Sequence, residues 1–173
     1  MKPTFAKLGL KLNNNFKTVM INDQEVEVKQ YLSIQDKLQI ISNVINLAAD
    51  DNNFNNPIKL QVFLKLETIF NYTNLSFTEK QKEDMVKLYD LLESNQIFEK
   101  IIEHIPESEY VMLQNGVIEC ADNLYKYRNS ALGIMESISS DYSDLNFDAT
   151  AIQEKLADEK NLELLRSILT KMG

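Results

Sequence analysis

Hydrophobic residues recur every three or four positions along most of the chain, and this spacing predicts amphipathic α-helices. Ser33 followed by Asp36 predicts a capped helix start. Asn56 before Pro57 predicts a second, because asparagine is a good N-cap and proline suits the first helical position. The expected apolar stripes are Ile34, Leu38, Ile41, Val44, Ile45 and Ala48 in the first helix, and Ile58, Val62, Leu66 and Ile69 in the second.

Later runs predict further helices. Thr78 and Gln81 form a box-like cap before one helix, and Pro106 ends a short helix over 97–105. From Glu107 to about Ser139, steps of three and four predict one long helix of about 50 Å. Asp148 and Asp158 are expected to cap two final short helices. The expected apolar residues are Met85, Leu88, Leu91 and Leu92, then Tyr110, Leu113, Val117, Cys120, Leu124, Tyr127, Ala131, Ile134 and Ile138.

The only strong β signal lies in residues 16–31. Val26 and Val28 follow Asn22-Asp23 and alternate with charged residues, which predicts a β-hairpin with one buried face. An isolated hairpin is marginal in water, so this one should pack on the helical body or on another chain. The predicted fold is therefore mainly α: an irregular helical bundle with one long helix and a short N-terminal β-hairpin.

The chain of 173 residues is long enough for one domain with a substantial core. We expect residues 1–15, which end in three asparagines, to form an N-terminal arm. Residues 16–173 are then expected to form a single helical domain that includes the hairpin.

Charge is unevenly distributed along the chain. Lys2, Lys7, Lys11 and Lys17 are the only charged side chains up to Asn22, so this stretch is net +4 and the rest is −12 in a chain of net charge −8. A basic arm can contact phosphate or an acidic neighbouring subunit. Because the acidic body repels nucleic acid, we expect a protein partner.

Candidate chemistry is sparse. His104 is the only histidine and Cys120 the only cysteine, and Pro106 separates them. Cys120 falls on an apolar stripe, where cysteine is usually a small buried hydrophobe, and His104 suits the last turn of a helix. One histidine and one cysteine do not make a structural zinc site. We expect no enzyme activity, no cofactor, no metal site, no signal peptide and no membrane span.

Three segments stand out: VEVKQYLSIQDKLQIISNVI (26–45), NPIKLQVFLKLETIFNYTNLSFTEKQKED (56–84) and LADEKNLELLRSILTKMG (156–173). They resemble segments of small proteins encoded among the structural genes of tailed phages of low-GC Gram-positive bacteria. Some proteins of this kind are tail assembly chaperones. The resemblance implies binding to hydrophobic stretches of a tape-measure protein or to tail-tube subunits.

The expected function is thus that of a non-enzymatic phage morphogenesis protein, either a tail assembly chaperone or a head–tail structural subunit. The alternative is a phage-encoded inhibitor of a host or immune protein. The partners of such a morphogenesis protein would be other phage structural proteins or further copies of itself. They would meet in the host cytoplasm or in the assembled virion. The last predicted helix is expected to bind a partner, and the competing interpretation is that its apolar residues pack in the core. The expected partner-binding residues are Lys2, Lys7, Lys11, Lys17, Leu162, Leu165, Ile168 and Leu169.

Overall fold

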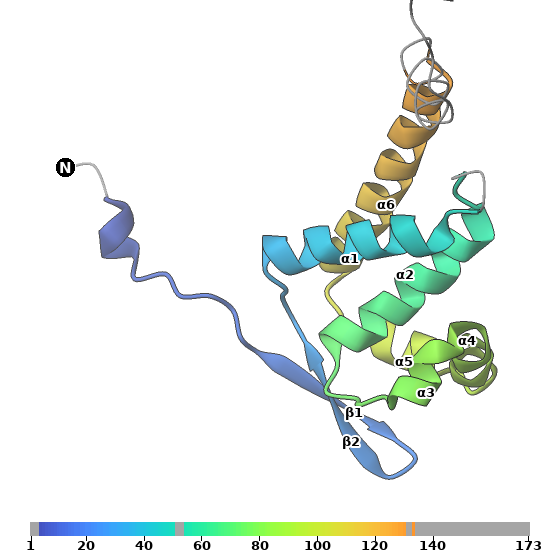
Figure 1. Ribbon diagram of the computed structural model, residues 1–173. Helices are drawn as coiled ribbons and strands as arrows, with labels where there is room; N and C mark the ends of the chain where they lie inside the picture. The colour runs from blue at the N-terminus through green and yellow to red at the C-terminus, as the bar shows by residue number, and fades with distance from the viewer. Residues whose placement is uncertain (1–3, 51–53, 131–132, 134–173) are drawn as a thin grey trace, which may run out of the picture. The chain divides into compact units, whose positions relative to one another are not determined.

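The computed structural model describes residues 4–50, 54–130 and 133. The described residues form a 3-10 helix (η1, Phe5–Leu8), an antiparallel hairpin and six α-helices (Figure 1). This confirms the predicted mainly α fold with an N-terminal hairpin. The strands are β1 (Phe16–Ile21) and β2 (Gln24–Lys29), and the helices are α1 (Ile34–Ala48), α2 (Pro57–Tyr72), α3 (Glu79–Glu83), α4 (Met85–Ser94), α5 (Ile97–Ile102) and α6 (Glu107–Arg128).

The chain divides into two compact units, residues 1–125 and 126–173. The first unit contains the hairpin, α1 to α5 and most of α6. In the second unit the structure describes only residues 126–130 and 133. The expected helices capped by Asp148 and Asp158 lie outside the described residues.

The hairpin forms where period-two alternation predicted it. Asn22 and Asp23 both have positive φ, 47° and 61°, as the two central residues of a type I′ turn require. Val19 pairs with Val26 across the ladder, and both are buried. The hairpin packs on the helical body, as its marginal intrinsic stability requires.

The outer edge of β2 is tied to the segment that follows α2. Val28 forms an isolated antiparallel bridge with Thr73. The Asn74 N–H donates to the Glu27 carbonyl at 3.3 Å, and the Glu27 N–H donates to Asn74 Oδ1 at 3.1 Å. The hairpin is therefore attached to the body through both apolar packing and backbone hydrogen bonds.

The three predicted N-caps that fall within the described residues are confirmed. Ser33 Oγ accepts from the Asp36 N–H at 3.1 Å, and Asn56 Oδ1 accepts from the Ile58 N–H at 2.9 Å. Thr78 and Gln81 form a reciprocal capping box. Each cap satisfies backbone donors that have no partner within the helix.

Two predicted helix extents were wrong because polar side chains interrupt them, and the short helix predicted over 97–105 ends at Ile102. Asp84 separates α3 from α4: its backbone leaves the helical region, and its side chain accepts from the Lys87 N–H at 3.1 Å. The predicted long helix over 107–139 ends at Arg128. After it, Ser130 Oγ donates to the Tyr127 carbonyl at 2.6 Å and accepts from the Gly133 N–H at 3.2 Å, so the hydroxyl acts as a new cap.

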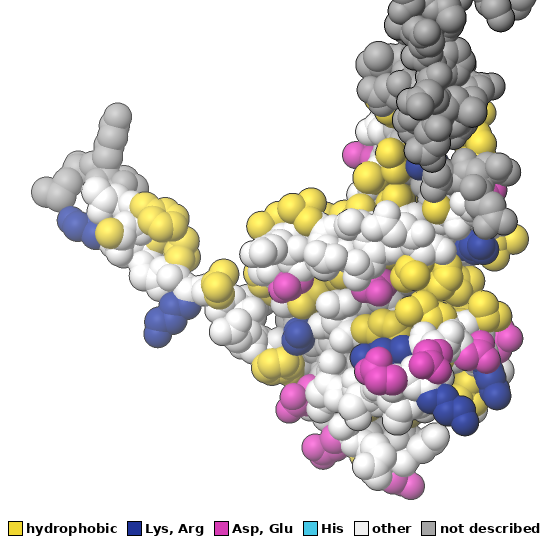
Figure 2. All heavy atoms as spheres, in the orientation of Figure 1, with side chains coloured by type: hydrophobic (Ala, Val, Ile, Leu, Met, Phe, Trp, Pro, Cys, Tyr) yellow, Lys and Arg dark blue, Asp and Glu magenta, His cyan; other side chains and the backbone are white. Residues whose placement is uncertain are grey.

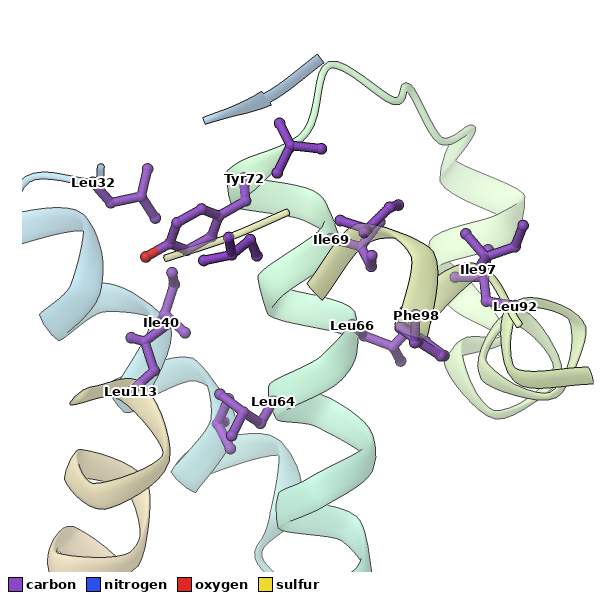
Figure 3. Packing of buried hydrophobic residues seen from close by; sticks show 14 of the residues in the cluster. Leu32, Ile40, Leu64, Leu66, Ile69, Tyr72, Leu92, Ile97, Phe98 and Leu113 are labelled. Atoms are coloured by element: carbon purple, nitrogen blue, oxygen red, sulfur yellow. The ribbon is translucent and has the colours of Figure 1, made fainter. Parts of the chain in front are cut away.

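The core lies among the hairpin and helices α1, α2, α4, α5 and α6, and Figure 3 shows its centre along α2. Part of the predicted α1 stripe was wrong. Ile34 and Leu38 are 61% and 60% exposed, and Ile58 at the start of α2 is 73% exposed. The face of α1 that packs inward carries the predicted Val44, Ile45 and Ala48, together with Lys37 and Ile40, which were not predicted.

Gly116 explains how α6 comes close to α1. A Cβ atom at this position would lie 2.5 Å from Ile41 Cδ1. Glycine within a helix costs about 1 kcal/mol relative to alanine. Here the missing side chain lets the two helices approach one another.

Candidate functional site

The described residues offer no assembled catalytic or metal centre. They contain no group of three or more His, Cys, Asp or Glu side chains placed to hold a metal ion. Cys120 is exposed, so its predicted burial was wrong. His104 Nδ1 lies 2.9 Å from the Lys100 carbonyl, and no hydrogen bond joins His104 to Cys120 in the described chain. Separately, no helix among these residues is both long and apolar enough to cross a membrane.

A largely buried polar cluster is centred on Glu109. Its carboxylate accepts from Lys37 Nζ at 2.7 Å, the Leu32 N–H at 3.1 Å and the Tyr72 hydroxyl at 3.1 Å. Figure 3 shows the Tyr72 ring between Leu32 and Ile40. Burial, together with the adjacent Glu109 charge, raises the pKa of the Tyr72 hydroxyl, so it remains a proton donor.

This cluster joins four segments of the chain. Leu32 precedes α1, Lys37 lies on α1, Tyr72 ends α2 and Glu109 lies in the first turn of α6. Lys37 is only 4% exposed, and the contacts of the carboxylate are made within the chain. The Glu109 cluster therefore acts as an internal clamp that fixes the start of α6 against α1 and α2.

Glu67 forms a second buried polar contact, between α1 and α2. Its Oε2 accepts from Asn43 Nδ2 and Asn71 Nδ2, each at 3.2 Å. Burial raises the pKa of the Glu67 carboxyl above 4.5, although the two amide donors act in the opposite direction. Folding therefore favours the protonated carboxyl.

Glu67→Gln is expected to stabilise the fold at pH 8 by up to about 1 kcal/mol, because glutamine avoids burying a charge and keeps an acceptor. In the wild type, the stabilising contribution of protonated Glu67 to the free energy of unfolding is fully present below pH 4.5. It is lost as the pH rises through the higher folded-state pKa. Urea unfolding across this pH range should show that the variant lacks this loss. The exposed Glu83→Gln is the control, and an equal pH profile for Glu67→Gln and wild type would contradict the expectation.

The N-terminal arm combines basic and apolar side chains. Phe5, Leu8, Leu10 and Leu12 are 80%, 56%, 69% and 76% exposed. Gly9 has a φ of +58° and ends η1, and the residues after it up to Asn15 form no helix or strand. Figure 2 shows yellow side chains along the arm with lysines among them. In the described chain, residues 4–14 form no hydrogen bond with the helical body.

Two of the grooves on the described helical body expose apolar surface. One, of about 450 Å³, lies between α2 and α6, and it is lined by Pro57, Leu60, Gln61, Leu64, Lys65, Tyr110, Gln114, Val117, Ile118, Ala121 and Asp122. The other, of about 370 Å³, runs along α3 and α4, and it is lined by Thr78, Lys80, Gln81, Asp84, Lys87, Leu88 and Leu91.

Three of the expected partner-binding residues are exposed at the N-terminus: Lys7 and Lys11 on the arm, and Lys17 on β1. Lys2, Leu162, Leu165, Ile168 and Leu169 lie outside the described residues. The apolar half of the arm was not predicted from the sequence. The alternation of Leu8, Leu10 and Leu12 was the available signal, since apolar residues at every second position are typical of an extended segment with one apolar face.

No protein-family model, curated protein or solved structure matches this chain. The site is therefore defined by its geometry alone: an exposed, basic and apolar arm, and two grooves between helices.

Proposed function

We propose that this protein is a non-enzymatic phage morphogenesis protein that acts by protein–protein contact, as a tail assembly chaperone or as a head–tail structural subunit. The exposed apolar arm is the main support. Phe5 and the three arm leucines have more than half of their surface in water, which is costly unless a partner covers them. An arm of this composition suits binding to another polypeptide.

Charge supports a protein partner over nucleic acid. The lysines at positions 7, 11 and 17 are exposed beside the arm's apolar side chains, whereas the body is strongly acidic. An acidic body repels phosphate, so the arm's favourable contacts are with acidic and apolar protein surfaces. The resemblance of residues 26–45 and 56–84 to phage structural proteins supplies the biological setting of the proposal.

Removing residues 1–14 should weaken binding to the partner at least about tenfold, because burial of each arm leucine contributes roughly 1.5–3 kcal/mol. This truncation keeps Asn15, whose carbonyl accepts from the Gln30 N–H at 3.0 Å. The chain would be co-expressed with the tape-measure and tail-tube proteins of the phage genome that, on this proposal, encodes it. Co-purification followed by titration would then give the affinities.

A full-length variant with Leu8→Ser, Leu10→Ser and Leu12→Ser separates the apolar contribution from chain length. The control, Leu38→Ser, removes a leucine that is 60% exposed on α1 and lines neither groove. The proposal is contradicted if neither virion protein binds the intact chain, or if the arm variants bind as tightly as the control.

A further inference from the structure

We propose that the arm of one copy docks into the α2–α6 groove of a second copy, so that the protein assembles by arm exchange. This inference rests on the proposed function and names one partner of the arm. Three observations support it. The arm is an uncovered apolar segment, and the α2–α6 groove of the same chain exposes apolar surface. The charges of this groove suit the arm better than those of the α3–α4 groove.

The two surfaces match in apolar character. Leu8, Leu10 and Leu12 are exposed on the arm. The α2–α6 groove is lined by Leu60, Leu64, Val117 and Ala121. Ile118, which also lines it, is 57% exposed. Docking would cover apolar surface on both sides, which is the main favourable term in protein association.

The charge distribution favours the α2–α6 groove as the docking site of the arm. Its one cation, Lys65, is neutralised by Glu93 at 2.8 Å, whereas Asp122 forms no ion pair in the described chain. Lys7 and Lys11 lie among the arm's leucines and would meet the Asp122 carboxylate. Opposite charges at the edge of an apolar contact set its register.

The α3–α4 groove has the wrong sign for a basic arm. Lys80 and Lys87 line it, and Asp84 is the only acid among its lining residues. The Asp84 side chain is already engaged as the cap of α4. Juxtaposing like charges would disfavour docking of Lys7 and Lys11 there.

The arm is long enough to extend from its own chain to a second copy. Residues 9–15, which form no helix or strand, span up to about 23 Å when extended. A non-reciprocal exchange joins different surfaces of successive copies and gives rings or filaments, whereas a reciprocal exchange gives a closed dimer. Either geometry serves an assembly protein.

Cysteine cross-linking tests the contact itself. Two preparations of different mass, both carrying Cys120→Ser, would contain Leu10→Cys or Ile118→Cys and be mixed under mild oxidation. We expect a disulfide between the two preparations, because docking would bring the sites within bonding distance. Val86→Cys, at an exposed apolar position on α4, replaces Ile118→Cys in the control and should not cross-link. Equal cross-linking of the two would overturn the inference, as would a disulfide that forms only within one chain when both cysteines are combined.

Light scattering across a concentration series tests the assembly. Wild type should form dimers or larger species, and Ile118→Lys should weaken self-association at least tenfold, whereas Val86→Lys should not. A monomeric wild type whose arm is still required to bind the tape-measure protein would overturn arm exchange and leave the proposed function standing. If the arm affects neither self-association nor virion-protein binding, both fail.

Discussion

Replacing Glu109 with alanine is expected to destabilise the fold by about 3–5 kcal/mol, because the change leaves a buried lysine without its counter-ion. Lys37 is 4% exposed and its Nζ lies 2.7 Å from the Glu109 carboxylate. The variant also removes the acceptor for the Leu32 N–H and the Tyr72 hydroxyl. Since a domain is stable by only about 5–15 kcal/mol, this loss is large. Urea unfolding followed by far-UV circular dichroism would measure it.

Two further variants decide whether the loss comes from the buried charge. The more solvent-accessible pair Lys65–Glu93, whose side chains are 28% and 46% exposed, is the control, and Glu93→Ala should cost less than about 1 kcal/mol. The double variant Lys37→Met/Glu109→Leu removes both charges and should recover much of the stability lost in Glu109→Ala. If the double variant is no more stable than Glu109→Ala, the unpaired lysine is not the cause.

Phe98→Ala is expected to cost about 3–5 kcal/mol, because it opens a cavity in the core. Phe98 is 1% exposed, its ring centroid lies 5.2 Å from that of Tyr89, and Lys65 Nζ lies 5.3 Å from its centroid. Figure 3 shows its side chain near Leu66 and Ile97. Thermal and urea unfolding would both report the loss.

Phe5→Ala supplies the converse experiment on the arm. Phe5 is 80% exposed, so its removal should leave the free energy of unfolding unchanged within about 0.5 kcal/mol. The same change should weaken partner binding. A stability loss for Phe5→Ala similar to that of Phe98→Ala would show that the arm packs on the body, contrary to its exposure here.

The elements that were predicted correctly depend on residues within four positions of one another. Asn56 and Thr78 each cap backbone donors two or three residues ahead, and Asn22-Asp23 supplies the left-handed turn between two alternating segments. The same local chemistry worked against the prediction at Asp84 and Ser130. At both positions the apolar residues continue at helical spacing, but a polar side chain caps a new helical turn and interrupts the helix.

The sequence by itself determined the helical class, the hairpin and most helix starts, because caps and periodicity act locally. Tertiary structure decided which face each helix buries, since that depends on the partner helix: Leu38 is exposed where Lys37 is buried, and Cys120 faces out. It also brought Glu109 to Lys37 across more than 70 positions. The basic arm was visible in the sequence, but the α2–α6 groove exists only because two distant helices pack together.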